Sequence, residues 1–141
     1  MKRIFLILFL IPQSIGNLVT TGVVSTPKER AISQINKEKV TLTIYRPTLS
    51  QTDSTPNITA SGFKIDTLNP NKHKIIAVSR DLKNNGWSFG KKVRIKKAGK
   101  YNGVYTIRDV MNKRHKKRID VLVGDDHDPI KLSEVEITLL N

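Results

Sequence analysis

Two aspartates, Asp109 and Asp120, are the residues of this chain whose type and spacing could do chemistry. Asp109 ends one short run of alternating apolar and polar residues, at 104–108, and Asp120 lies inside a second run, at 119–123. A basic connection at 113–118 separates the two runs. Two strands joined in this way can bring two carboxyl groups close together, as general acid–base catalysis requires. Aspartates also form turns at strand ends and face solvent on alternating strands, so this spacing leaves structural roles open.

The elements that must position these aspartates are short strands. Period-two alternation, or a continuous apolar run, predicts strands at 40–45, 75–78, 93–95, 104–108, 119–123 and 134–140. Asn102 and Gly103 predict a tight hairpin turn before the fourth of these strands, because both residue types tolerate a positive φ. Six or seven short strands with almost no helix predict a small all-β barrel.

The 141 residues are enough for one domain, preceded by two other segments. Residues 1–16 combine a cationic head with an apolar run at 4–11 and small residues, which is the layout of a secretory signal peptide; an uncleaved membrane anchor is the alternative. Residues 17–39 have no sustained apolar period and predict a tether, so the domain covers 40–141. The chain has no cysteine, so a packed core and not a disulfide must stabilise the domain.

The chain is strongly basic, with a formal net charge of +13. Such a charge favours polyanionic partners, namely nucleic acid, an anionic membrane or an acidic cell-wall polymer. A signal peptide predicts export to the periplasm, outer membrane or cell wall, and there nucleic acid is the least expected of the three. Membrane proximity through the N-terminal segment is compatible with the same sequence.

Neither a metal nor another cofactor is predicted. The acidic stretch at 124–129 lacks the ligand and glycine spacing of a calcium loop. His73, His115 and His127 are scattered and form no metal-binding pair. The acidic stretch is therefore interpreted as a turn.

Five segments, in this order, resemble the 3D family, a branch of the double-psi β-barrels named for three aspartates. They are TPNITASG (55–62), KIIAVSRDL (74–82), FGKKVRI (89–95), YNGVYTIRDVM (101–111) and KRIDVLV (117–123). The family includes lytic transglycosylases that cut the glycan strands of peptidoglycan. The resemblance, which covers about residues 40–140, implies a six-stranded double-psi β-barrel, exported and active on peptidoglycan. A monomer is expected.

The resemblance also implies roles for individual residues. Asp120 matches the third family aspartate, the proposed catalytic acid, and Asp109 matches the second, which supports it. Thr59, Ser61 and Gly62 match the segment that lines the substrate groove.

Two departures from the family pattern bear on activity. Ser79 stands at the position of the first aspartate, with an acid two residues later at Asp81, which is a candidate replacement at the substrate. Val110 and Met111 follow the second aspartate, where the family has threonine and glycines. Arg118, next to the third aspartate, is expected to flank the groove and meet the acidic peptide stems of the wall.

The implied reaction needs one carboxylic acid that donates a proton to the glycosidic oxygen. The resulting carboxylate then takes the proton of the sugar's own 6-hydroxyl, which closes onto C1 and leaves an anhydro-sugar end. A hydrolase that activates water with two carboxylates is the nearest alternative. A wall-binding barrel without chemistry is the second, favoured by the two departures. A basic protein that binds any polyanion is the third.

Overall fold

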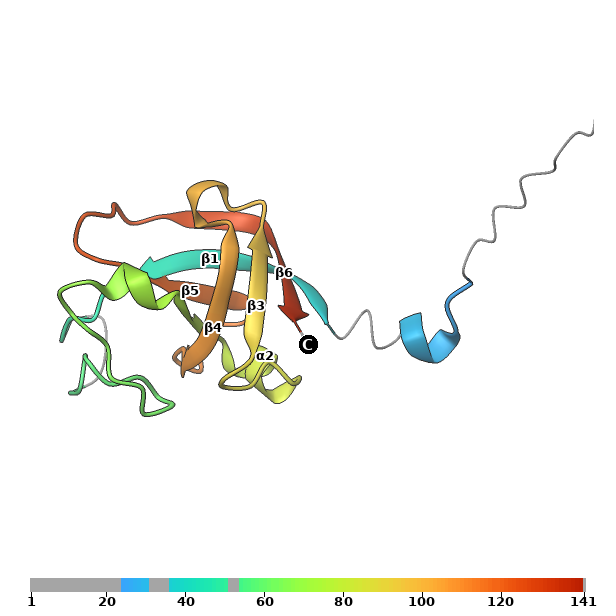
Figure 1. The fold of residues 1–141 in the computed structure, drawn as a ribbon, viewed down its shortest axis with the longest axis horizontal. Coiled ribbons are helices and arrows are strands. Elements are labelled where there is room, and N and C mark those ends of the chain that lie inside the picture. Colours follow the sequence, from blue (N-terminus) through green and yellow to red (C-terminus); the bar gives the residue numbers. More distant parts are fainter. Residues whose placement is uncertain (1–23, 31–35, 51–53, 141) are drawn as a thin grey trace, which may run out of the picture.

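Six strands close into a barrel in this computed structural model, which describes residues 24–30, 36–50 and 54–140 (Figure 1). The strands are β1 (Lys37–Tyr45), β2 (Ile75–Val78), β3 (Lys92–Lys96), β4 (Gly103–Val110), β5 (Arg118–Leu122) and β6 (Lys131–Leu140). Around the barrel their order is β1-β5-β2-β4-β3-β6. The predicted small all-β barrel is confirmed, and the closed six-stranded architecture is compatible with a double-psi barrel.

Residues 27–30 are helical and precede β1 (Figure 1). The other helical elements that the structure describes are short and lie in the connections between strands. They are η1 (Pro70–His73), α2 (Arg80–Asn84) and η2 (Gly99–Tyr101). The predicted hairpin joins β3 to β4, with Ile95 opposite Gly103, but its turn is lengthened by η2. None of the helices that the structure describes is long and apolar enough to cross a membrane. The predicted signal peptide at 1–16 lies outside the described residues.

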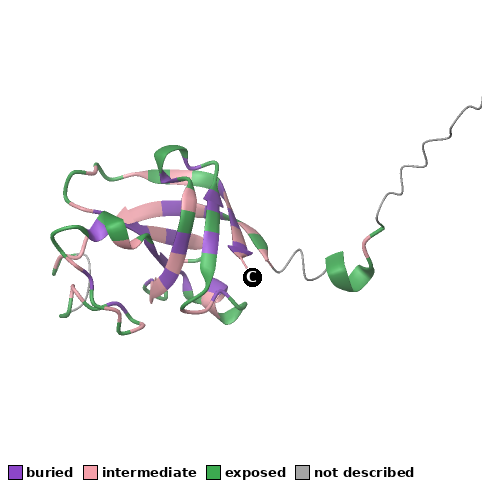
Figure 2. Ribbon diagram, in the orientation of Figure 1, coloured by how far each residue is buried: buried purple, intermediate pink, exposed green. Residues whose placement is uncertain are grey.

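Side chains from one face of every strand fill the barrel interior. On β3, Val93 and Ile95 are buried, whereas Lys92, Arg94 and Lys96 between and beside them are exposed (Figure 2). Successive residues of a strand point to opposite faces, so this alternation follows directly from the sequence pattern. With no disulfide in the chain, burial of these apolar side chains holds the barrel together.

A second apolar cluster lies outside the barrel, over β2. It contains Tyr45, Ile65, Ile75, Ala77, Met111 and Leu122, with Phe63 packed against it. On β2, Ile76 and Val78 belong to the interior cluster while Ile75 and Ala77 belong to the outer one. Burial on both faces explains why β2 is a continuous apolar run and not an alternating one.

The first strand begins before the predicted domain boundary. β1 starts at Lys37, and its first residues pair with β6, Lys37 opposite Thr138 and Lys39 opposite Glu136. Lys39 also forms an ion pair of 2.9 Å with Glu134. These residues join the sheet through backbone hydrogen bonds without burying an apolar side chain, so hydrophobic alternation could not reveal them. The segment predicted as a tether therefore contributes the start of the barrel.

Candidate active site

Strand β2 lies between the two aspartates. Ala77 pairs with Asp109 of β4 on one side and with Asp120 of β5 on the other. Directly paired residues on neighbouring strands point to the same face of a sheet, so the two carboxyl groups flank Ala77 on the outside of the barrel. Their backbones are two strand spacings apart, about 10 Å. The small alanine side chain between them leaves room for a ligand.

A β-bulge in β4 decides where Asp109 points. Ile76 pairs with Ile107, yet the next residue, Ala77, pairs with Asp109, so Arg108 is an extra residue in the ladder. Without it, regular alternation would place Asp109 on the same side as Ile107, inside the barrel. Bulges re-aim side chains in this way and are common next to active sites. The predicted approach of the two acids therefore depends on one irregular residue.

Both acids line a groove of about 600 Å³ on the outside of the barrel. Besides the acids and Ala77, its walls include Tyr45, Ile58, Ala60, Arg80, Arg114 and His115. These residues come from β1, the loop before η1, α2 and the loop between β4 and β5. The groove thus combines two carboxyl groups with a basic wall, on a side of the barrel that is open to solvent.

Asp109 is held as a hydrogen-bond acceptor by three donors. The Tyr45 hydroxyl donates to its Oδ2 at 3.2 Å. The backbone N–H groups of Ala60 and Val110 donate to its Oδ1 at 3.0 and 2.9 Å. Together these bonds fix the orientation of the Asp109 carboxyl group.

Asp120 has the opposite surroundings. Its Oδ1 is buried and has no hydrogen-bond partner among the described residues. Burial raises the pKa of Asp120 to about 6, against the lowering effects of the Thr43 hydroxyl and the Arg118 charge, and the Asp109 charge adds to the rise. A carboxyl group with this pKa is protonated in a useful fraction of molecules near neutral pH, so it can serve as a proton donor.

The three residues predicted to line the groove build a turn beside it. The hydroxyls of Thr59 and Ser61 lie 3.0 Å apart, and the Gly62 N–H donates to the Thr59 carbonyl at 2.8 Å. Gly62 has a φ of +81°, which favours glycine. This turn directs the Ala60 N–H at Asp109. Thr59, Ser61 and Gly62 themselves are not among the lining residues, whereas Pro56, Ile58 and Ala60 of the same segment are.

Ser79 and Asp81 hold the start of β5 instead of lining the groove. The fully buried Ser79 hydroxyl accepts a hydrogen bond of 3.1 Å from the Arg118 N–H. Asp81 Oδ2 accepts one of 2.9 Å from the Lys117 N–H. Burial tends to raise the pKa of Asp81, but hydrogen bonds from the Ser79 hydroxyl and the Lys117 N–H outweigh it and lower the pKa. Together the two residues anchor the strand that carries Asp120.

Packing and hydrogen bonding explain why Val110 and Met111 can follow Asp109, where the resemblance led us to expect threonine and glycines. Met111 is buried in the outer apolar cluster, and its N–H donates to the Val78 carbonyl at 2.9 Å. Val110 continues β4 opposite Val78. Neither Val110 nor Met111 has a positive φ, so the backbone here does not require glycine.

Arg118, predicted to flank the groove, lies behind its basic wall. One of its terminal nitrogens lies 3.0 Å from Nδ1 of His115, and Arg114 Nε donates to Nε2 of the same ring at 3.2 Å. Burial and the two arginine charges lower the pKa of His115. The residues that reach the groove are Arg80, Arg114 and His115. Sequence reasoning missed them because neither the basic loop that carries Arg114 and His115 nor the short helix α2 that carries Arg80 shows in the sequence which side chains turn toward the groove.

Comparisons with protein-family models, with curated proteins and with solved structures found no match. Among residues 24–30, 36–50 and 54–140, no group of three or more His, Cys, Asp or Glu residues is placed to hold a metal ion. The chemistry that the groove can perform thus has to be inferred from its two carboxyl groups and the basic residues beside them.

Proposed function

We propose that this protein is an exported enzyme of the 3D type that cleaves peptidoglycan glycan strands as a lytic transglycosylase, with Asp120 as the acid/base. The observation that carries the proposal is the state of Asp120. Its Oδ1 is buried without a partner and its pKa is raised to about 6, while Asp109 lies across Ala77 in the same groove. Paired carboxyl groups with such different surroundings are typical of general acid–base sites.

In the proposed reaction, protonated Asp120 donates its proton to the glycosidic oxygen while the bond from that oxygen to C1 breaks. The positive charge that develops at C1 is stabilised by the nearby Asp109 carboxylate. The Asp120 carboxylate then accepts the proton of the 6-hydroxyl, whose oxygen bonds to C1 and closes an anhydro ring. Asp120 returns to its starting state, and no water is consumed.

Asp109 supports this cycle in two ways. Its charge adds to the rise in the pKa of Asp120 that burial causes, which increases the protonated fraction of the acid near neutral pH. Its own position is fixed by the Tyr45 hydroxyl and the Ala60 and Val110 N–H groups, so little reorganisation is needed during the reaction.

The basic wall of the groove suits the substrate. Arg80 and Arg114 line the same groove as the two acids. Peptide stems of peptidoglycan carry carboxylates, which guanidinium groups bind through paired hydrogen bonds. The sugar ring would then lie over Ala77, between Asp109 and Asp120.

The test is digestion of purified peptidoglycan by the chain starting at Asn17, with the products identified by mass spectrometry. Fragments that end in an anhydro-muramyl sugar support the proposal, whereas reducing ends would identify a hydrolase. Protein that pellets with the wall but releases no fragments would identify a binding module. The Asp120→Asn variant should release no fragments. Asp128→Asn, which removes an exposed acid of the same type, is the matched control and should cleave normally.

A further inference from the structure

The polar side chains at the start of α2 are used on another element. Ser79 is the N-cap residue of α2, but in the part of the chain that the structure describes its side chain makes no capping hydrogen bond. A serine at this position ordinarily accepts a hydrogen bond from an N–H group of the first helical turn. The Ser79 hydroxyl instead accepts the Arg118 N–H at 3.1 Å. Asp81, in the first turn, accepts the Lys117 N–H at 2.9 Å.

The backbone of Lys117 has a conformation that other contacts must hold in place. Its φ of +44° lies in the left-handed region, which is unfavourable for a residue with a Cβ atom. Asp81 accepts its N–H, and its carbonyl accepts the Thr41 N–H at 3.0 Å. Conformations of this kind persist where the surrounding structure fixes them. Asp81 thus helps to set the direction in which the chain leaves the basic loop and enters β5.

Arg118, the first residue of β5, is held at both of its backbone groups. Its N–H donates to the Ser79 hydroxyl, and its carbonyl accepts the Ser79 N–H at 2.9 Å. Asp120 follows two residues later, between Thr43 of β1 and Ala77 of β2. The start of β5 therefore decides where the Asp120 carboxyl group lies in the groove.

Arg80 lies between the two residues that hold β5. It is exposed and lines the groove, whereas its neighbours Ser79 and Asp81 bind the start of β5. Three consecutive residues thus connect the basic wall of the groove to the strand that carries the acid.

We propose that Ser79 and Asp81 are positioning residues, which fix Asp120 in the groove relative to Arg80 through the backbone of Lys117 and Arg118. This role rests on the proposed function of Asp120 as the acid/base. Neither Ser79 nor Asp81 is among the described residues that line the groove, so both act through β5 and not by touching substrate.

The pKa of Asp120 reports its position without reference to activity. Among the described residues, this pKa responds to burial, the Thr43 hydroxyl and the charges of Arg118 and Asp109. Asp81 is not one of these influences. A change in the pKa of Asp120 on substitution of Asp81 would therefore come from movement of β5.

The test combines NMR titration of the Asp120 carboxyl carbon in the full chain with kinetics on solubilised glycan strands. In Asp81→Ala, β5 loses a contact at its start and Asp120 gains water, so the midpoint should fall toward that of an ordinary aspartate. The value of kcat should fall about tenfold and KM should change less than about twofold, because the acid is misplaced and the substrate contacts remain. Ser79→Ala should change both readouts in the same direction by less.

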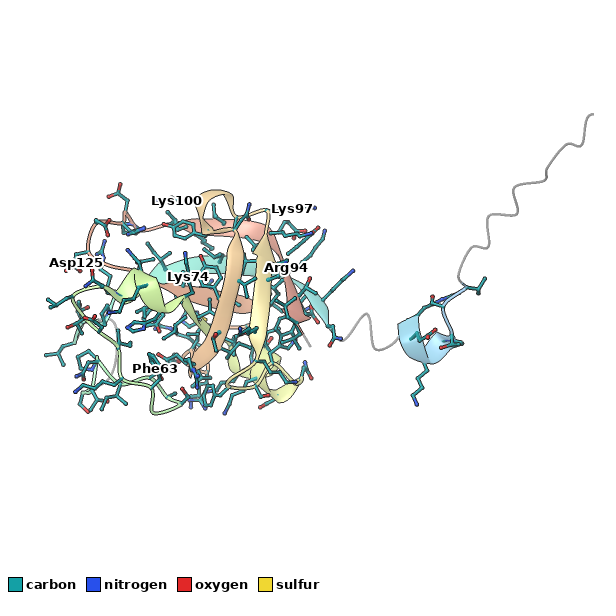
Figure 3. All side chains as sticks on the ribbon, in the orientation of Figure 1. Phe63, Lys74, Arg94, Lys97, Lys100 and Asp125 are labelled. Carbon is teal, nitrogen blue, oxygen red and sulfur yellow. The ribbon has the colours of Figure 1, made fainter. Side chains whose placement is uncertain are left out.

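Two control variants separate positioning from charge. Asp81→Asn keeps an oxygen for the Lys117 N–H and should restore the midpoint and kcat to near the native values. Asp125→Ala removes the same charge as Asp81→Ala and should change neither readout. Asp125 is exposed on the loop between β5 and β6, which Figure 3 shows well apart from α2 as labelled in Figure 1.

The two readouts distinguish failure of this proposal from failure of the proposed function. A native midpoint of Asp120 in both Asp81→Ala and Ser79→Ala would overturn the positioning role, even if the native chain cleaves the wall. A lowered midpoint in these variants, restored by Asp81→Asn, would support it. Absence of cleavage by the native chain would refute the proposed function alone, because the midpoints are measured without substrate.

Discussion

Asp109 and Asp120 occupy two sides of one groove, flank the same alanine, and differ in their surroundings. On the β4 side, three donors converge on the Asp109 carboxylate. On the β5 side, one oxygen of Asp120 is buried without any partner. The barrel therefore gives two chemically identical side chains different hydrogen-bonding surroundings through local contacts alone. The donors around Asp109 suit a carboxyl group that is held in place during the reaction. The unpaired oxygen of Asp120 suits a carboxyl group that gives up and regains a proton.

The largest effect is expected from removing the proton donor itself. Asp120→Asn keeps the shape of the side chain but cannot exchange the proton, so peptidoglycan cleavage should fall at least ~100-fold. Release of soluble fragments from purified wall measures the rate, and co-sedimentation measures binding, which should be retained. Unchanged cleavage by this variant would remove Asp120 from the mechanism.

The same substitution should stabilise the fold at neutral pH. The pKa of Asp120 rises from 3.8 to about 6 on folding, so its contribution lowers stability as the pH rises from about 4 to about 6. The loss amounts to about 3 kcal/mol above pH 6. Asp120→Asn should therefore be more stable than the native chain by about that amount at pH 7 and equally stable below pH 4, as urea unfolding at both pH values would show. A native chain that is the more stable one at pH 7 would contradict the unpaired state of Asp120.

Substitutions of Asp109, on the other side of the groove, should lower the stability of the fold instead of raising it. Asp109→Ala leaves the Tyr45 hydroxyl and the N–H groups of Ala60 and Val110 without an acceptor, and should cost about 2 kcal/mol of stability. Asp109→Asn keeps an oxygen for the two N–H groups and should cost less than half as much. Urea unfolding at pH 7 measures both, and equal losses for the two variants would mean that these hydrogen bonds contribute little.

The smallest expected effect concerns one of those donors. Tyr45→Phe removes only the hydroxyl that donates to Asp109 and keeps the ring in the outer apolar cluster. We expect a loss of about 1 kcal/mol in stability. In the Asp109→Ala background the same substitution should cost almost nothing, because its partner is already gone; a double-mutant cycle measures this coupling. Full additivity of the two losses would show that the bond does not stabilise the fold.

Much of this arrangement followed from local sequence patterns. Alternation of apolar residues predicted strands, as at Val93 and Ile95, and the continuous apolar run at 75–78 predicted β2. The order of short motifs brought Asp109 and Asp120 together as candidates, and the structure places both in one groove. These features depend on near neighbours in the chain, so the sequence alone can reveal them.

Other features depend on contacts between distant segments. The extra residue Arg108 in β4 is visible only once β2 pairs alongside it, and regular alternation would have pointed Asp109 into the barrel. Likewise, Ala60 has no reactive side chain, so only the folded turn shows that its N–H binds Asp109. Ser79, at a position where the family has an acid, is an anchor for the Arg118 N–H, which no motif indicates.

The most direct test of the contrast between the two sides is the pKa of Asp120 itself, measured by NMR titration of its side-chain carboxyl carbon in the full chain. The Asp120→Asn variant identifies the signal by its disappearance. The surroundings on the β5 side predict a midpoint near pH 6. A midpoint at or below pH 4 would show that Asp120 is solvated or paired like an ordinary aspartate, and would contradict its role as the proton donor.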